Sequence, residues 1–318
     1  MSQLPKFLVI GVQKAATSWL FYCLQEHPEI FLPSHKREVD YLGGEKYQQR
    51  GWEWWASRFE GAKSRHIVGD VSVDYIYSTR SAKLIKENLG DVKFVISLRD
   101  PIDRAISAYY WNLRKGKIPN KPLNKGMEAI LKTLIKKGGS DFDSKTERVY
   151  RNIIMRGFYD EQISRYLDYF ELKNFLFLDF DNIKRNPLRQ VQSIYDFLGV
   201  NKSYNPTALN RKPKNNAYLD PLIVLERRAG KSRLTGKLAD WLNGVASKLG
   251  IGNSRPKLEK ELKNKLLDIY TSHNEKLLDI LLDYQNTNEN TLTEQNNWRE
   301  TITSWNKIVE DRDKKTGT

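Results

Sequence analysis

Cysteine is nearly missing from this chain, which has one, Cys23, among its 318 residues. A single cysteine excludes an intramolecular disulfide, and its place on an apolar predicted helix favours a buried thiol. With one cysteine and four histidines, the sequence offers no metal-ligand cluster, so we expect no structural zinc and no metal cofactor. Such cysteine usage favours a reducing, cytoplasmic compartment.

Long apolar runs are missing as well. No stretch approaches the ~18 consecutive apolar residues of a membrane-spanning helix. The N-terminus enters the first predicted strand without the basic segment, apolar stretch and small-residue cleavage site of a secretory signal. The chain has no internal repeat. These absences predict a globular, cytoplasmic protein.

Positive charge is abundant, because 53 Lys and Arg residues against 39 Asp and Glu residues give a formal net charge of +14. This charge favours an anionic partner: nucleic acid, acidic lipid, a polyanionic sugar or a nucleotide. The sequence lacks zinc-finger spacing, an RNP motif and a homeodomain pattern, so we expect no nucleic-acid partner.

The stretch from Lys6 to Leu20 organises the rest of the chain. The apolar run Phe7–Ile10 predicts a buried central strand, and Thr17 and Ser18 begin a helix after a short loop. This arrangement predicts an anion site, because the helix N-terminus and the charge of Lys14 both attract negative groups. A strand–turn–helix with a surface lysine is the alternative.

The loop does not match the ATP-binding pattern G-x-x-x-x-G-K-[ST]. Counting from Gly11 places Ala16 at the second glycine and Thr17 at the lysine. Lys14 instead lies before the hydroxyl residues, so a Walker-type nucleotide site is not expected here.

Apolar runs that alternate with helical patterns define the fold class. Further strands are predicted at Ile67–Ser72, Lys93–Leu98 and Phe175–Leu178. This order predicts a three-layer α/β protein with a parallel sheet of about four or five strands and Phe7–Ile10 at its centre. Ligands bind at the carboxyl ends of the strands in such sheets. Gly11, Asp70 and Arg99 all fall near these ends.

We predict a single domain from residue 1 to 285 and a C-terminal extension, 286–318, with an amphipathic helix. Two segments of the domain, 115–148 and 201–256, are expected to be irregular, the first around one helix. The basic amphipathic stretch 222–249 has two interpretations, helices packed on the core or contact with an acidic membrane surface. We favour the packed helices.

A charged segment follows the first predicted helix. Glu38 comes directly after two basic residues, Lys36 and Arg37, where its carboxylate could accept a proton from an acceptor hydroxyl. A solvated charge cluster is the alternative. Three tryptophans follow, Trp52, Trp54 and Trp55. Packing of one helix face against the core is favoured for them over stacking on sugar rings.

A second motif, R-D-P-x-x-R-x-x-S, spans Arg99 to Ser107 directly behind the strand predicted at Lys93–Leu98. A guanidinium at the end of a strand and a hydroxyl on the next helix can bind one phosphate, with arginine contacting two of its oxygens. The motif therefore predicts a second anion site at the same edge of the sheet as the Lys14 loop.

The two motifs together resemble those of sulfotransferases that use 3′-phosphoadenosine 5′-phosphosulfate (PAPS). In that family a loop lysine followed by small and hydroxyl residues holds the 5′-phosphosulfate, and the R-D-P motif holds the 3′-phosphate. The order of Lys14, the Glu38 segment and Arg99 looks most like the heparan-sulfate-modifying branch and its bacterial relatives. The resemblance covers roughly residues 6–198 and implies the sulfotransferase fold, which is similar to that of P-loop NTPases.

The chain departs from this branch at several positions. Ala16 stands where glycine is more usual, Asp40 where histidine is usual, and Val71 where many animal members have lysine. A cysteine-bounded basic loop late in the domain is also missing, so the acceptor could differ from heparan sulfate. We expect Arg211, Lys212 and Lys214 to make some of the nucleotide contacts that this loop makes in the family.

The resemblance implies transfer of a sulfuryl group from PAPS to an acceptor, with adenosine 3′,5′-bisphosphate (PAP) as product and no metal. Glu38 would take the proton of the acceptor, and Lys14 would stabilise the leaving phosphate. Arg99 and Ser107 would bind the 3′-phosphate. The donor loop would comprise Lys14, Ala15, Ala16, Thr17 and Ser18. The acceptor would be bound by Lys36, Arg37, Asp40 and Asp70.

We expect the acceptor to be a hydroxyl or amine of a carbohydrate or glycoconjugate, and the alternative is a small hydroxylated metabolite or lipid. Two alternatives of another class are a P-loop nucleotide kinase and a non-catalytic binder of anionic polymers. A P-loop kinase would need a glycine directly before the lysine, and the order of residues here argues against it. A pure binder of anionic polymers would have basic residues without a glutamate such as Glu38 facing the bound anion.

Overall fold

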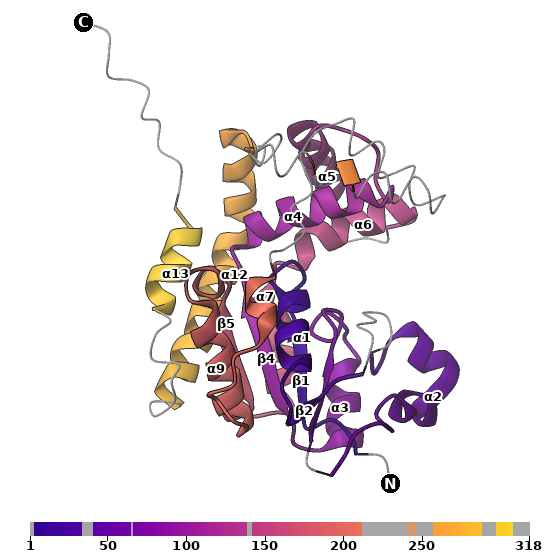
Figure 1. Cartoon of the computed structure of the whole chain (residues 1–318). Helices are drawn as coiled ribbons and strands as arrows, with labels where there is room; N and C mark the ends of the chain where they lie inside the picture. Colours follow the sequence, from indigo (N-terminus) through magenta and orange to yellow (C-terminus); the bar gives the residue numbers. More distant parts are fainter. Residues whose placement is uncertain are drawn as a thin grey trace, which may run out of the picture. The chain divides into compact units, whose positions relative to one another are not determined.

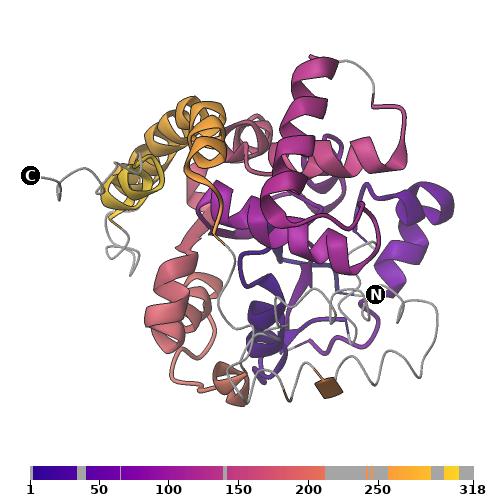
Figure 2. The ribbon, with the colours of Figure 1, turned by 90° about the horizontal axis from the view of Figure 1, so that it is seen from above.

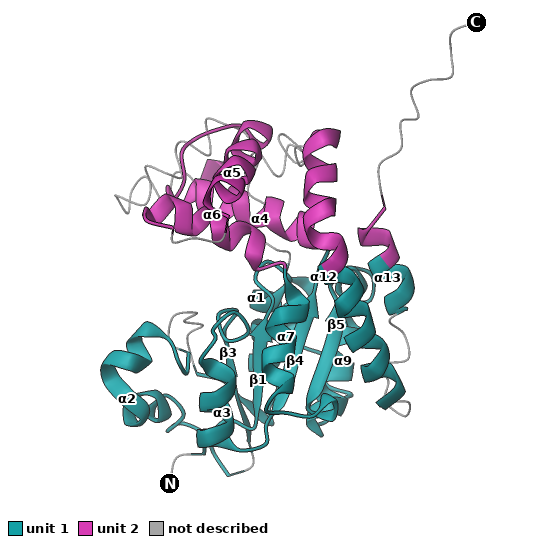
Figure 3. Cartoon of the chain, turned by 180° about the vertical axis from the view of Figure 1, so that it is seen from behind, with its two compact units in different colours: residues 1–100, 158–213, 273–302 teal, residues 101–157, 214–272, 303–318 magenta. Residues whose placement is uncertain are grey.

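The computed structural model describes residues 3–33, 41–64, 66–138, 142–211, 241–242, 245, 257–287 and 297–307. They fall into two compact units (Figure 3). Unit 1 comprises Met1–Asp100, Phe158–Pro213 and His273–Ile302. Unit 2 comprises Pro101–Gly157, Lys214–Ser272 and Thr303–Thr318. Figures 1 and 2 show the elements coloured along the sequence.

Unit 1 is built on a five-stranded parallel sheet with the order β2-β3-β1-β4-β5. Its strands are β1 (Phe7–Gly11), β2 (Ile30–Phe31), β3 (Ile67–Val71), β4 (Lys93–Leu98) and β5 (Phe175–Asp179). The predicted α/β class, parallel sheet and central position of the first strand are confirmed. β2 was not predicted, because two residues are too short to show a periodic pattern.

Helices cover both faces of this sheet. Those that lie wholly in unit 1 are α1 (Thr17–Gln25), α2 (Glu45–Ser57), α3 (Ser81–Leu89), α7 (Tyr159–Leu167), α8 (Phe180–Arg185), α9 (Pro187–Leu198) and the short η1 (Leu172–Asn174) and η2 (Thr207–Asn210), and the later part of α12 (Lys260–Thr287), which carries Tyr284, also belongs to this unit. α1 and α9 share one buried cluster with strand side chains. On the opposite face Tyr166 of α7 packs on Phe94, and Tyr284 packs on Phe177. Because neighbouring strand residues point to opposite faces, unit 1 has the predicted three layers.

Cys23 lies on α1 in the cluster between that helix and α9, and it is 0% exposed. Its backbone carbonyl accepts a hydrogen bond from the Tyr195 hydroxyl at 3.1 Å. Burial raises the pKa of the thiol to about 12. The prediction of a buried thiol is confirmed.

Unit 2 contains α4 (Pro101–Arg114), α5 (Leu123–Lys137) and α6 (Lys145–Met155). The segment 115–148, expected to be irregular around one helix, therefore holds α5 and the start of a second helix. α6 was not predicted, because the charged composition of this segment favoured an irregular structure. Its first turn carries a capping box, in which the side chains of Ser144 and Glu147 each accept a hydrogen bond from the other residue's backbone N–H. The spacing S-x-x-E is the sequence signal for this helix start.

The C-terminal part of the chain includes α12 (Lys260–Thr287) and α13 (Trp298–Trp305). α12 runs past residue 285, where the boundary of the extension was predicted, and the division into one domain and an extension stays a prediction. Most of 201–256, including nearly all of the basic stretch 222–249, lies outside the described residues. Within the described part of the chain, no helix has both the length and the apolar character needed to cross a membrane.

Candidate active site

The loop between β1 and α1 has an uncommon backbone. Lys14 (φ 72°) and Ala16 (φ 64°) both lie in the left-handed region, where residues other than glycine are strained. Ala16 is the N-cap of α1, and no side chain caps the helix there. The positive end of α1 therefore meets the loop that carries Lys14, as an anion site requires.

Replacing Ala16 with glycine should raise the free energy of unfolding by up to ~1 kcal/mol. Glycine adopts a left-handed conformation without the ~1–2 kcal/mol penalty of other residues, and its greater freedom in the unfolded chain offsets ~0.5–1 kcal/mol of that gain. The control is Ala15→Gly, because buried Ala15 has no positive φ, and this change should be destabilising. Urea unfolding measures both, and a destabilised Ala16→Gly would contradict the strain argument.

Arg99 directly follows β4, and its guanidinium reaches the Lys14 loop. Its Nη1 donates to the Lys14 carbonyl at 2.8 Å, and the guanidinium lies 4.4 Å from the centroid of the Phe180 ring. The backbone carbonyl of Arg99 accepts from the Tyr159 hydroxyl at 2.9 Å. Lys14 and Arg99, two of the predicted donor-binding residues, thus lie together at the carboxyl edge of the sheet. Phe180 and Tyr159 contact Arg99 there, and the sequence analysis assigned neither of them a role.

Asp100 of the R-D-P motif belongs to unit 1 with Arg99, whereas Pro101, Arg104 and Ser107 belong to unit 2. Arg104 is 0% exposed, and its guanidinium donates to the carbonyl of Ile153. This second arginine therefore holds α4 to α6 within unit 2. Ser107 is half-buried on α4, one turn further along. Ser107 and Arg99 fall in different units, so their joint binding of a phosphate stays a prediction.

Arg211 packs against α1, the helix that follows the Lys14 loop. Its guanidinium lies 3.4 Å from the centroid of the Tyr22 ring. Glu26, at the end of α1, accepts from the Thr207 hydroxyl and the Ala208 N–H at 3.0 and 3.1 Å. These bonds hold η2, and with it Arg211, beside α1.

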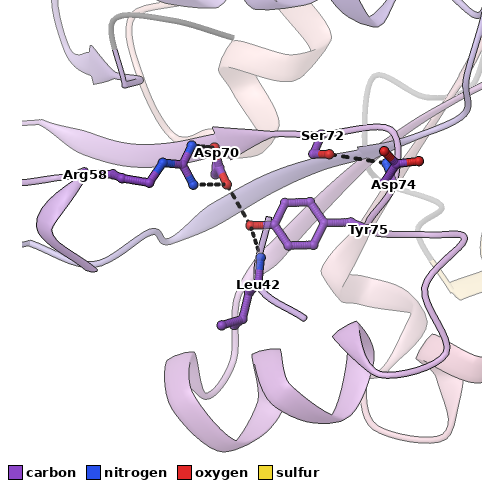
Figure 4. Close-up of polar contacts among 6 residues, drawn as sticks. All are labelled: Leu42, Arg58, Asp70, Ser72, Asp74 and Tyr75. Carbon is purple, nitrogen blue, oxygen red and sulfur yellow. Dashed lines mark hydrogen bonds and ion pairs between the residues drawn. The ribbon is translucent and has the colours of Figure 1, made fainter. Parts of the chain in front are cut away.

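Asp70 lies inside β3, in register with Leu8 of β1, and its side chain is buried. The carboxylate accepts two hydrogen bonds from Arg58, at 3.0 and 3.3 Å, and one from the Tyr75 hydroxyl at 2.6 Å (Figure 4). Burial and the charge of Asp70 raise the pKa of Tyr75, so this hydroxyl stays protonated and donates. These contacts do not support the predicted contact of Asp70 with the acceptor.

The three tryptophans of α2 have different environments. Trp55 is 0% exposed and packs between Trp52 and Phe59, with ring centroids 5.4 and 4.9 Å away. Trp52 and Trp54 are half-buried. Trp55 is therefore a core residue, and of the three tryptophans only the other two keep part of their surface accessible to solvent.

Several predicted site residues lie outside the described residues, and their roles stay predictions: Lys36, Arg37, Glu38, Asp40, Lys212 and Lys214. Among the residues that the structure does describe, no group of three or more His, Cys, Asp or Glu side chains could hold a metal ion.

The parallel sheet, the lysine loop at a helix N-terminus and the arginine behind the adjacent strand define an α/β protein with a P-loop-like strand–loop–helix. The model of the sulfotransferase domain family matches residues 4–219. The chain therefore belongs to the sulfotransferase domain family, as the two motifs predicted.

Individual relatives agree with this family. The chain is 29% identical over 285 residues to the mouse bifunctional heparan sulfate N-deacetylase/N-sulfotransferase 4, covering 87% of this chain and 30% of the relative. It is 26% identical over 200 residues to the mouse heparan sulfate glucosamine 3-O-sulfotransferase 5, and this match covers 63% of this chain and 55% of the relative. The chain thus spans less than two thirds of either relative.

A solved structure confirms the fold. A sulfotransferase from Alicyclobacillus acidocaldarius superposes with a TM-score of 0.61 at 21% identity. The match covers 87% of this chain and 96% of that protein. At this level of sequence identity, the similarity shows a shared architecture alone.

Proposed function

We propose that this protein transfers a sulfuryl group from PAPS to a hydroxyl or amine of a carbohydrate or glycoconjugate. The observation that carries the proposal is the hydrogen bond of Arg99 Nη1 to the Lys14 carbonyl, at 2.8 Å. It joins the two cationic motifs of the sulfotransferase family at one edge of the sheet. A PAPS molecule has anionic groups at both its 5′ and 3′ positions, so it suits a site with two neighbouring cations.

The chemistry follows from the charges. Lys14 and the positive end of α1 would stabilise the negative charge that develops on the phosphate as the bond to sulfur breaks. Arg99, with Ser107, would bind the 3′-phosphate and so fix the position of the donor without touching the reacting atoms. Glu38 would remove the proton from the acceptor as its oxygen or nitrogen attacks sulfur. The products are the sulfated acceptor and PAP.

Three observations support a carbohydrate acceptor. Both relatives described above act, by their names, on heparan sulfate. The net charge of +14 attracts a polyanionic chain. Trp52 and Trp54 are half-buried, and Arg50 lies over Trp54 at 5.6 Å from its centroid. A cationic group beside half-buried tryptophans suits an anionic sugar. The compartment, expected to be the cytoplasm, stays a prediction.

Transfer of sulfate from labelled PAPS to a polysaccharide panel should give product, and raising the salt concentration should weaken capture of the charged polymer strongly. The panel comprises heparan sulfate, desulfated heparin and an uncharged glucan, with a parallel panel of phenols and lipid alcohols. Product from phenols or lipids alone, with little response to salt, would show that the acceptor is a small hydroxylated molecule instead. No transfer to either panel, with PAP binding intact, would leave a nucleotide-binding protein without this activity.

A further inference from the structure

The helix α7 follows β4 along the sheet of unit 1. Near the start of the strand, Tyr166 packs edge-on against Phe94, with ring centroids 5.3 Å apart. At the other end of the helix, the Tyr159 hydroxyl donates to the carbonyl of Arg99, one residue past the end of the strand, at 2.9 Å. Tyr159 is 1% exposed, and a hydrogen bond with little access to water is stronger than one at the surface.

The first turn of α7 is held from a second element, the part of α12 that belongs to unit 1. Nδ1 of His273 lies 2.9 and 3.0 Å from the two carboxylate oxygens of Asp160. An ionised carboxylate can only accept, so Nδ1 donates this bond. The ring of His273 also stacks on Phe158, with centroids 3.9 Å apart and an angle of 13° between the planes. Two neighbours of Tyr159 in the chain are therefore fixed by one histidine.

Arg99 lies at a point where its backbone needs such support. It follows the last pair of the ladder between β4 and β5, Leu98 with Asp179. Its guanidinium is held at the far end, by the Lys14 carbonyl at 2.8 Å and by the Phe180 ring at 4.4 Å. Ordering an arginine side chain costs much rotamer freedom. Contacts at both ends of the residue meet part of that cost before a ligand binds.

We propose that Tyr159, together with Asp160 and His273, positions Arg99 for recognition of the 3′-phosphate. This inference rests on the proposed function, in which Arg99 binds the 3′-phosphate of PAPS. A guanidinium binds a phosphate through N–H groups in a fixed, planar fork, so a small rotation weakens the contact. If the Arg99 carbonyl is released, the positive charge stays in place and its orientation is lost. Selectivity for the 3′-phosphate should then fall more than the general affinity for nucleotides.

The test is Tyr159→Phe, which removes the hydroxyl and keeps the ring. The affinity for PAP relative to AMP should fall by about threefold or more, the scale of one lost hydrogen bond. The affinity for AMP should stay within about twofold, because AMP lacks the 3′-phosphate and the charge of Arg99 is kept. Calorimetric titration with the two nucleotides measures both values. The carbonyl NMR resonance of Arg99 should also shift, since its oxygen loses a donor.

Two sets of matched variants control this test. Tyr195→Phe removes another buried hydroxyl of unit 1 that binds a backbone carbonyl, that of Cys23, and it should leave the ratio of affinities and the Arg99 resonance unchanged. His273→Leu removes the donor to Asp160 and should lower the ratio in the same direction as Tyr159→Phe. Asparagine places an N–H group near the position of Nδ1, so His273→Asn should keep more of the preference for PAP than His273→Leu.

A double variant tests whether Tyr159 acts through Arg99. When Arg99→Ala is already present, Tyr159→Phe should change the ratio of affinities no further. A further loss in the double variant would overturn the action through Arg99. Equal losses of PAP and AMP affinity in Tyr159→Phe would indicate a general structural role and would also overturn the proposal.

Failure of this inference can be told apart from failure of the function on which it rests. If the wild-type protein binds PAP and AMP equally well, the assignment of the 3′-phosphate to Arg99 is wrong, and with it the basis of the proposal. If the wild-type protein prefers PAP and Tyr159→Phe keeps both this preference and the Arg99 resonance, the function stands and the positioning contacts are refuted.

Discussion

Replacing Glu38 with glutamine should lower turnover by ~10²–10⁴-fold, the usual contribution of a positioned general base. Glutamine keeps the shape of the side chain and cannot take a proton from the acceptor. Binding of PAP should be unchanged, because in the proposed mechanism Glu38 contacts the acceptor and not the donor. Steady-state transfer of labelled sulfate and calorimetric titration with PAP measure the two quantities separately.

The matched control for this change is Glu45→Gln, the same substitution at an exposed residue in the first turn of α2. It should leave turnover at the wild-type level. If Glu38→Gln also keeps near-normal turnover, Asp40 becomes the candidate base. Asp70 is a poor substitute, because its buried carboxylate already accepts three hydrogen bonds from Arg58 and Tyr75.

The sheet of unit 1 could be predicted because its strands β1 and β5 are short apolar runs with every residue buried. Parallel strands covered by helices on both faces leave this signature in the sequence. The Lys14 loop could be predicted for a related reason, since its residues are contiguous and the helix N-terminus follows directly. Local patterns of this kind do not depend on distant parts of the chain.

The contacts that orient the site could not be predicted in this way. Tyr159 binds a carbonyl 60 residues earlier, at Arg99, and no periodicity links the two positions. Arg58 follows a tryptophan-rich stretch, and its pairing with Asp70 depends on how α2 packs beside β3. Asp70 was assigned to the acceptor because it lies near a strand end, and strand position alone does not reveal that its carboxylate is already bound.

Replacing Arg99 with alanine should abolish the preference of the protein for PAP over AMP. The two nucleotides differ in the 3′-phosphate, and a lost hydrogen bond to a charged group costs ~1.5–3 kcal/mol, or roughly 10- to 150-fold in affinity. Arg99 also donates to the Lys14 carbonyl, so the variant should lose part of its affinity for AMP as well. The ratio of the two dissociation constants isolates the contribution of the 3′-phosphate.

Three further variants make the test specific. Ser107→Ala should reduce the same ratio by less, because the hydroxyl supplies one hydrogen bond to the phosphate, whereas arginine can supply two together with a positive charge. Phe180→Leu removes the ring 4.4 Å from the guanidinium but keeps the charge, so it should weaken PAP binding by about 1 kcal/mol or less. Lys173→Ala removes one positive charge just before β5, at the opposite end of the strands, and should change neither constant. A preference for PAP over AMP that survives in Arg99→Ala would mean that the 3′-phosphate binds elsewhere. If Lys173→Ala lowers the preference for PAP as much as Arg99→Ala does, then the net charge of the protein, and not Arg99, recognises the 3′-phosphate.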